Sequence, residues 1–390
     1  MMGREDDIPR KVLIISAEMG EGHNAAAAAL TEVIRDRWPD CELLQLDTME
    51  VRGHRFARLA RWSYSFQLNV WPWSYEVSYS VLSRSQRVAD VSRSLAEAFF
   101  GPRLERAMRG KSPDVVISTY PFGSAALSWL RKKRHLDALT VTYIPAFHVH
   151  PLWVYDSIDM HFAMYDTAAE HALLRGLDHS LRVGAPPVRR GFGDFGREEA
   201  RRVFGLAQDD FVVLVTGGAW GLGAVASGVE ALVDMDGPPV HVMAVCGKNS
   251  QLEAQVRAIE EKRPGRLSVF GYIAQMPEAM AAADVVVTNG AGVTVLEALR
   301  TPRPVVAFAP LAGHGIASTM EMVRRHLAVE ADDVAQLVAQ VKRLRTDSQW
   351  LRTMEKAGEE WVRGRDLRLS LGEIEDEWAA SRAGGRGRVG

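Results

Sequence analysis

The sequence is poor in cysteine, in net charge and in long apolar runs. Its two cysteines, Cys41 and Cys246, have no C-x-x-C partner, so we expect a cytoplasmic protein without a disulfide framework or zinc site. A formal charge of −2 gives no global attraction to nucleic acid, and we expect no such partner. No apolar run reaches the ~18–20 residues of a membrane span. The acidic N-terminus does not resemble a signal peptide.

What the chain does contain is one pattern that occurs twice. A buried strand, a Gly-containing loop and a helix rich in small residues begin at residue 11 and again at residue 211. Continuous apolar strands separated by helices are typical of parallel sheets, and 390 residues favour two domains. We therefore predict an α/β protein with two Rossmann-like, doubly wound domains. The strands are expected at 11–16, 41–46, 114–118, 140–144 and 158–164, then at 211–215, 241–245, 268–270, 284–288 and 304–308.

The domain boundary is predicted where Pro186 and Pro187 interrupt the pattern. Residues 1–185 would form the N-terminal domain and residues 186–365 the C-terminal domain. Residues 366–390 would hold the end of the last helix and a disordered, Gly- and Arg-rich tail.

The first glycine loop places a histidine at the start of a helix. Gly20, Gly22 and His23 lie between a strand and that helix, where ligands of α/β folds bind. A tight turn with a solvated histidine is the simpler interpretation. A dinucleotide site is another, because residues 20–25 formally match G-x-G-x-x-A and Asp47 follows the second strand. However, the first glycine of such a site should come directly after the first strand, and here the four residues 17–20 intervene. A dinucleotide site also leaves the second glycine-rich half unexplained.

The stretch from Thr288 to Leu299 suggests a nucleotide site. A buried strand leads into a small-residue loop that opens a helix, and the amides near Gly290 to Thr294 would cradle a diphosphate. Glu297 lies one turn later and would accept hydrogen bonds from ribose hydroxyls. The alternative is a helix capped by Thr294, with Glu297 as its capping-box acid. The glycine loops at Gly217 and Gly313 favour the ligand interpretation.

These motifs together resemble the family of monogalactosyldiacylglycerol synthases and processive diacylglycerol glucosyltransferases, which is glycosyltransferase family 28-like. The resemblance covers roughly residues 11–345 and is of an actinobacterial type. It rests on an ordered set of matches: Ser16-Ala-Glu-Met-Gly-Glu-Gly-His23 with Ala26; His150 and Trp153; Gly217-Gly-Ala-Trp-Gly221; Val245-Cys-Gly-Lys-Asn249; Phe270-Gly-Tyr-Ile273; and Gly292-Val-Thr-Val-Leu-Glu-Ala298.

The resemblance implies a GT-B fold, with two Rossmann domains facing across a cleft. It implies an inverting transfer of sugar from a uridine diphosphate (UDP) sugar to a lipid or lipid-linked hydroxyl. No cofactor and no metal are expected. His23 is the expected base, with Glu21 and His148 as rivals, and Gly22, Glu21, His148, His150 and Trp153 would bind the acceptor. The donor would be bound by Gly217, Gly218, Trp220, Gly247, Tyr272, Ile273, Gly290, Ala291, Gly292, Thr294, Glu297, Gly313, His314 and Gly315.

Three departures from the family pattern leave specificity open. Ala146 replaces the family's Asp, Asn289-Gly290-Ala291 replaces Pro-Gly-Gly, and His314-Gly315 replaces a Gln-Glu pair that touches the donor sugar. The donor sugar and the acceptor are therefore undetermined. Two alternatives remain open: transfer to a soluble metabolite, and a catalytically weakened sugar-nucleotide-binding protein.

An aromatic stretch runs from Phe56 to Tyr79. It contains eight aromatic residues, with Arg55, Arg58 and Arg61 interleaved. Tyrosine, tryptophan and arginine are typical of helices at a membrane interface, so the stretch would contact the inner face of the cell membrane or a greasy acceptor. A helix pair packed in the protein core is the alternative.

Overall fold

The structure is a computed structural model that describes residues 8–19, 21–164, 180–237, 239–290 and 292–383. Gly20, Ala291 and the predicted tail beyond Ala383 lie outside the described residues. The chain divides into two compact units. One comprises residues 1–67, 74–187 and 365–390, and the other comprises residues 68–73 and 188–364.

The first unit is built on a six-stranded parallel sheet in the order β2-β1-β3-β4-β5-β6. Its central strands are continuous buried runs, as expected for a sheet covered on both faces. β6 was not predicted, because three residues with a central arginine carry no apolar signal. The strands are β1 (Lys11–Ser16), β2 (Glu42–Asp47), β3 (Val115–Ser118), β4 (Leu139–Tyr143), β5 (Met160–Ala163) and β6 (Leu181–Val183).

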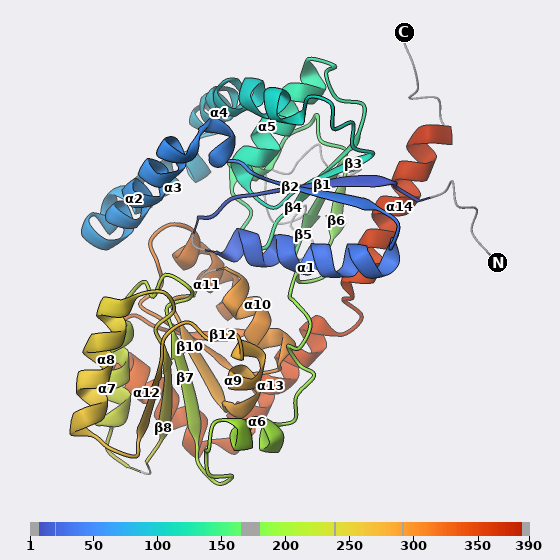
Figure 1. Ribbon diagram of the computed structural model, residues 1–390. Coiled ribbons are helices and arrows are strands. Elements are labelled where there is room, and N and C mark those ends of the chain that lie inside the picture. Colours follow the sequence, from blue (N-terminus) through green and yellow to red (C-terminus); the bar gives the residue numbers. More distant parts are fainter. Residues whose placement is uncertain (1–7, 20, 165–179, 238, 291, 384–390) are drawn as a thin grey trace, which may run out of the picture. The chain divides into compact units, whose positions relative to one another are not determined.

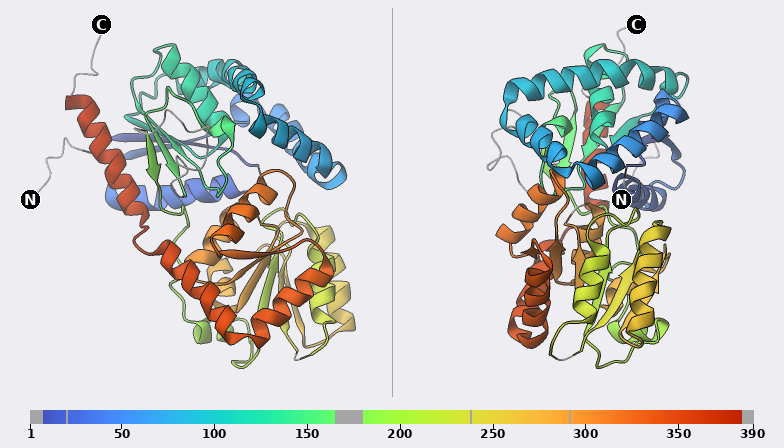
Figure 2. Two further views of the ribbon diagram at one scale, coloured as in Figure 1. Left: turned by 180° about the vertical axis from the view of Figure 1, so that it is seen from behind. Right: turned by 90° about the vertical axis from the view of Figure 1, so that its left-hand side faces the viewer.

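Helices cover both faces of this sheet. The alanine-rich α1 (Gly22–Arg37) lies on one face, whereas α4 (Gln86–Met108) and α5 (Pro121–Lys132) lie on the other (Figure 1). α14 (Leu367–Ala383) returns to this unit and packs beside α1. Two further helices, α2 (His54–Val70) and α3 (Pro72–Arg84), extend beyond the sheet as a hairpin (Figures 1 and 2). Short 3₁₀ helices precede α2 (η1, Glu50–Arg52) and follow β4 (η2, Pro151–Trp153).

The second unit is a six-stranded parallel sheet in the order β12-β11-β10-β7-β8-β9. Its valine-rich strands form one core with α7, α8 and α12, while α9 and α10 cover the other face (Figure 1). The strands are β7 (Val212–Thr216), β8 (His241–Val245), β9 (Leu267–Phe270), β10 (Val285–Thr288), β11 (Val305–Phe308) and β12 (Ala328–Ala331). The helices are α6 (Arg197–Val203), α7 (Val225–Val233), α8 (Ser250–Lys262), α9 (Met276–Ala282), α10 (Val293–Arg300), α11 (His314–Arg324), α12 (Val334–Thr346) and α13 (Ser348–Val362).

Each sheet contains a switch point, which is the place where the strand order reverses. In the first sheet β1 and β3 are neighbours, and in the second β7 and β10 are neighbours. Crossovers leave such a pair in opposite directions, which opens a crevice at the carboxyl ends of the two strands. The predicted glycine loops follow β1 in one unit and β7 and β10 in the other, so both lie at these crevices. The predicted α/β class with two doubly wound sheets is confirmed.

Within the described ranges, no helix is both long enough and apolar enough to cross a lipid bilayer.

Candidate functional site

His23 lies where the carboxyl ends of β1 and β3 meet. α1 begins at Gly22 after Glu21, whose φ of 66° is in the left-handed region. The His23 Nδ1 atom is 2.7 Å from the backbone carbonyl oxygen of Thr119, directly after β3. Because a carbonyl oxygen only accepts, Nδ1 donates in this bond and carries a proton. In the neutral imidazole the other nitrogen, Nε2, is then the one with basic character.

Aromatic rings surround the predicted acceptor residues. The ring of Tyr120 lies edge-on to His23 at 4.8 Å, and the buried Trp153 ring lies 5.9 Å from His23. The His150 side chain caps the start of η2, and its ring lies 4.4 Å from the Tyr79 ring, while the His148 ring lies 6.0 Å from it. The structure thus groups Trp153 with His23, and His148 with His150 around Tyr79.

The hairpin of α2 and α3 has two different faces. On its inner face, Tyr64 and Tyr75 share a hydrogen bond, and burial raises the pKa of Tyr64, Tyr75 and Tyr79. On its outer face, the side chains of Trp71 and Trp73 are 57% and 68% exposed. The core interpretation of this stretch is therefore wrong for the tryptophans, because they face solvent, whereas the three tyrosines are half-buried.

Asp47 has a structural role. One of its carboxylate oxygens accepts from the backbone amide of Glu18 at 2.7 Å, and the other accepts from Met49 at 2.7 Å and Glu50 at 3.0 Å. These bonds hold the loops that follow β1 and β2. The carboxylate that a dinucleotide site would direct at a ribose is thus already occupied.

In the second unit, the loops that follow β7 and β8 pack with their backbones in contact. A Cβ atom added to Gly217 would lie 2.3 Å from the Leu222 carbonyl oxygen, and one on Gly247 would lie 2.5 Å from the Ala219 carbonyl oxygen. Gly218 and Gly247 both have φ in the left-handed region. Only glycine fits such positions without strain. Close by, the Lys248 ammonium lies 5.4 Å from the Tyr272 ring centroid.

The remaining predicted residues of these loops are also placed. Trp220 and Ile273 are half-buried, whereas the side chain of Tyr272 is largely exposed. Asn289, at the end of β10, donates from Nδ2 to the Leu222 carbonyl oxygen at 3.3 Å. This bond joins the loop after β10 to the loop after β7 across the switch point.

The loop after β10 opens α10 without a side-chain cap. Its N-cap is Gly292, with φ of 73°, and Thr294 lies inside the first turn. The alternative of a Thr294 cap with Glu297 as its capping-box acid is therefore wrong. Gly290 also has a left-handed φ, and a Cβ atom there would lie 2.2 Å from the Thr319 hydroxyl oxygen. The amides of this helix start remain available to an anion.

Glu297 is buried on α10, and burial raises the pKa of its carboxyl to about 7. The positive charge of Arg189 acts in the opposite direction and lowers that pKa. Sequence reasoning missed Arg189, although its place directly after the Pro-Pro boundary was a signal. In the described part of the chain, the enclosed hydroxyls of Thr288 and Thr319 have no hydrogen-bond partner. Unpaired groups of this kind are often completed by a ligand.

α11 begins at the position of the family's Gln-Glu pair. Its N-cap is Gly313, with φ of 69°, and its first turn carries no acidic residue. Burial lowers the pKa of His314 to about 4, so the imidazole is neutral near pH 7. The helix start formed by Gly313, His314 and Gly315 is thus free of negative charge.

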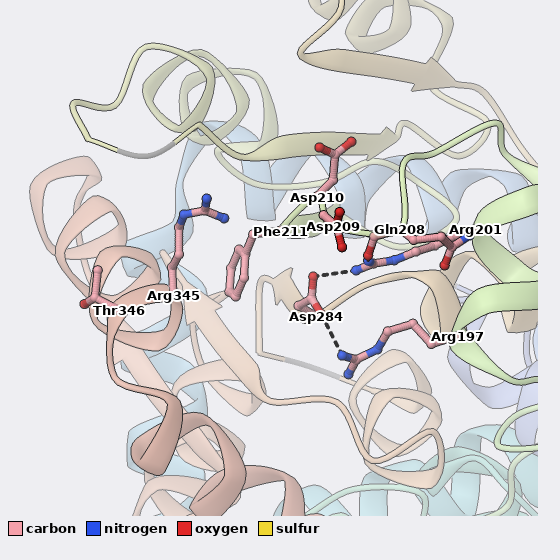
Figure 3. A pocket seen from close by; sticks show the side chains of 9 residues that line it. All are labelled: Arg197, Arg201, Gln208, Asp209, Asp210, Phe211, Asp284, Arg345 and Thr346. Carbon is pink, nitrogen blue, oxygen red and sulfur yellow. Dashed lines mark hydrogen bonds and ion pairs between the residues drawn. The ribbon is translucent and has the colours of Figure 1, made fainter.

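A pocket in the second unit lies at the wrong edge of the sheet to hold the donor. It surrounds Asp284, which forms ion pairs with Arg197 at 3.0 Å and Arg201 at 2.7 Å (Figure 3). Asp284 and Phe211 precede β10 and β7, so the pocket opens at the amino ends of these strands. Ligands of such sheets bind at the carboxyl ends. Asp284 also accepts from the Val212 amide, which indicates a structural role.

Comparisons with known proteins agree with this geometry. The calicheamicin glycosyltransferase CalG4 matches with a TM-score of 0.60 at 15% identity, over 96% of this chain and 99% of that one. MurG from Acinetobacter baumannii matches with a TM-score of 0.60 at 16% identity, over 95% of this chain and 100% of that one. With its two doubly wound sheets, the chain has the GT-B fold.

Family models match the two halves of the chain separately. Residues 23–183 match the family model for monogalactosyldiacylglycerol (MGDG) synthase, and residues 213–347 match the model for glycosyl transferases group 1. A processive diacylglycerol beta-glucosyltransferase of Bacillus cereus (strain AH187) is 25% identical over 352 residues, which are 89% of this chain and 88% of that protein. The chain carries an MGDG synthase domain followed by a group 1 glycosyl transferase domain, which confirms the resemblance seen in its motifs.

Proposed function

We propose that this glycosyltransferase moves a sugar from a UDP-sugar to the free hydroxyl of a diacylglycerol-type lipid, with inversion at the anomeric carbon. The observation that carries the proposal is the bond between His23 Nδ1 and the Thr119 carbonyl oxygen, at the switch point of the MGDG synthase domain. It supplies a base of fixed tautomer where the acceptor is expected. The acceptor class follows the name of the Bacillus cereus relative.

On the acceptor side, His23 acts as the general base. Nε2 takes the proton of the acceptor hydroxyl while that oxygen bonds to the anomeric carbon, and the bond from that carbon to the diphosphate breaks with its electrons. The imidazolium that forms keeps its Nδ1 donor bond to Thr119, so the ring does not reorient during proton transfer. The position of the family's aspartate holds Ala146, which packs against a buried apolar cluster that includes Trp153 and Val149. This position contributes no charge to the reaction.

On the donor side, Glu297 binds the ribose and the loop after β10 binds the diphosphate. The uncapped start of α10 supports this assignment, since its amides and helix dipole stabilise the charge on the departing diphosphate. Arg189 adds a positive charge beside Glu297. The neutral start of α11 contacts the sugar. We propose that this set works without a metal, so that activity is unchanged in excess chelator.

We propose that the acceptor domain docks on a membrane through the outer face of the α2–α3 hairpin. Residues 54–108 hold eight arginines and four acidic residues, although the whole chain is slightly negative. Beside this positive charge, Trp62, Trp71 and Trp73 are all more than half exposed. Exposed tryptophans with neighbouring arginines match the headgroup region of an anionic bilayer.

A transfer assay tests the proposed function. The full chain is incubated with dioleoylglycerol in anionic vesicles and a panel of UDP-sugars, and the product is identified by mass spectrometry. We expect a glycosyl-diacylglycerol with one of the sugars. Transfer only to soluble hydroxyl compounds would overturn the lipid acceptor. Donor binding by calorimetry without any transfer or hydrolysis would indicate the weakened, binding-only protein instead.

A further inference from the structure

Tyr120 lies beside His23 and has no role in the mechanism above. It is the last residue before α5, and its backbone is fixed by that helix start. Its carbonyl oxygen accepts from the Ser118 hydroxyl at 2.8 Å and from the Ser124 amide at 3.1 Å. The ring is therefore held on a rigid element, edge-on to the His23 ring at 4.8 Å.

The hydroxyl of Tyr120 differs from that of Tyr143, although both residues are buried. Tyr120 is only 6% exposed, and among the described residues none forms a hydrogen bond with its hydroxyl. This oxygen is also not among the enclosed, unpaired polar atoms of the described residues, whereas the hydroxyl of Tyr155 is. The Tyr120 hydroxyl is therefore open to a ligand or to water, which a phenylalanine would not bind. Tyr143 shows the ordinary arrangement in the same unit, since its buried hydroxyl donates to the Ala185 carbonyl oxygen at 2.6 Å.

The chemistry of this hydroxyl limits which group can form a hydrogen bond with it. Burial, together with the nearby Tyr75 and Asp47, raises the pKa of Tyr120 far above neutral pH, so the phenol keeps its proton. A group that only accepts, such as a carbonyl oxygen, is its best partner. In a diacylglycerol, an ester carbonyl lies a few bonds from the free hydroxyl that attacks the donor.

We propose that the Tyr120 hydroxyl donates a hydrogen bond to an ester carbonyl of the acceptor lipid and so positions the attacking hydroxyl at His23. The inference rests on the proposed lipid acceptor and adds a residue that selects ester-linked over ether-linked glycerolipids. Tyr120 is a positioning residue, because the proton itself moves to His23.

The test compares two acceptors on the full chain. Dioctanoylglycerol and its dioctyl ether analogue, which lacks the carbonyls, are supplied in the same mixed micelles with the donor sugar that the parent uses. One neutral hydrogen bond of about 1 kcal/mol corresponds to roughly fivefold in kcat/KM. The parent should therefore prefer the ester by about fivefold. Tyr120→Phe should lose this preference because its kcat/KM falls on the ester and stays the same on the ether. The donor KM and the melting temperature should be unchanged.

Tyr143→Phe is the matched control. It removes a buried, paired hydroxyl from the same sheet, so it should lower the melting temperature and leave the ester preference intact. A Tyr120→Phe variant that keeps the preference, or that loses activity equally on both acceptors, would overturn the role of Tyr120 alone. A parent that glycosylates neither acceptor would overturn the proposed lipid acceptor and this inference together.

Discussion

The two switch points use different parts of the polypeptide. At the carboxyl ends of β1 and β3, the site is formed mainly by side chains. The ring centroids of Tyr120 and Trp153 both lie within 6 Å of that of His23. At the carboxyl ends of β7 and β10, the loops are rich in glycines with left-handed φ, and these positions carry no Cβ atom beside the backbone amides. The first arrangement suits proton transfer to and from a hydroxyl, and the second suits a diphosphate.

Under the proposed function, the two crevices divide the work of a transferase between them. A base needs an imidazole whose tautomer is fixed by one hydrogen bond, and Thr119 supplies that bond from a neighbouring strand. An anion needs several amides at short range, which only a loop without Cβ atoms can offer. The four sets of substitutions below test this division, from the largest expected effect to the smallest.

Removing the base should have the largest effect. We expect His23→Ala to lower kcat at least ~100-fold, the low end for loss of a general base, while UDP affinity measured by calorimetry is retained. His135→Ala, on the same unit but paired with Glu105 at its surface, should keep full activity. Near-parental turnover of His23→Ala would transfer the role to Glu21 or His148.

Removing the ribose ligand should weaken the donor and alter its pH dependence. Loss of a charged hydrogen bond costs about 2 kcal/mol, so Glu297→Ala should bind a UDP-sugar ~30-fold more weakly. Ribose hydroxyls donate to the carboxylate, and the pKa of Glu297 is raised to about 7. Parental affinity should therefore be constant above pH 7 and fall as pH drops below it.

Glu297→Gln is the control for this pH dependence, because it cannot titrate. Its affinity for a UDP-sugar, whose diphosphate is a diester without a proton to lose near neutrality, should be flat from pH 5 to 8. Parental affinity that is equally flat over the range around the Glu297 pKa of about 7 would remove Glu297 from the donor site.

Two glycines of the donor loop are required for different reasons, one steric and one conformational. Both Gly290 and Gly292 have left-handed φ, but a Cβ atom meets the Thr319 hydroxyl at 2.2 Å in the first case and nothing within 4 Å in the second. Gly292→Ala should cost about 1 kcal/mol of unfolding free energy from backbone strain, and Gly290→Ala about 1–2 kcal/mol more from overpacking. Denaturant unfolding measures both.

The added cost of Gly290→Ala should shrink when Thr319→Ala removes the opposing hydroxyl. A double variant no more stable than Gly290→Ala alone would show that the close approach to Thr319 is not what requires glycine.

The smallest expected effect is on membrane binding. Replacing the exposed Trp71 and Trp73 with serine should reduce binding to anionic vesicles at low salt by roughly three- to tenfold, without lowering the melting temperature. Leu369→Ser, at an equally exposed apolar residue on α14, should bind vesicles like the parent. If the parent itself does not bind anionic vesicles in co-sedimentation, the membrane proposal fails and a soluble acceptor gains support.

The sequence by itself determined the two parallel sheets and the positions of their ligand loops. Buried apolar runs such as Val12 to Ile15 and Val285 to Val287 predict strands covered on both faces, and glycines in the loops after them indicate turns. Short strands were missed where the apolar signal was weak, as in β6 and β12. These features depend on local patterning, which the linear sequence carries.

Only the tertiary structure decided which residues meet across the fold. Nothing in the sequence pairs His23 with Thr119 or places Tyr120 against it, because these residues are about a hundred positions apart and come together only through the β1–β3 register. The two faces of the α2–α3 hairpin were equally hidden, since its tyrosines and tryptophans share one aromatic stretch. Burial separates them, and burial is a property of packing between elements rather than of the order of residues.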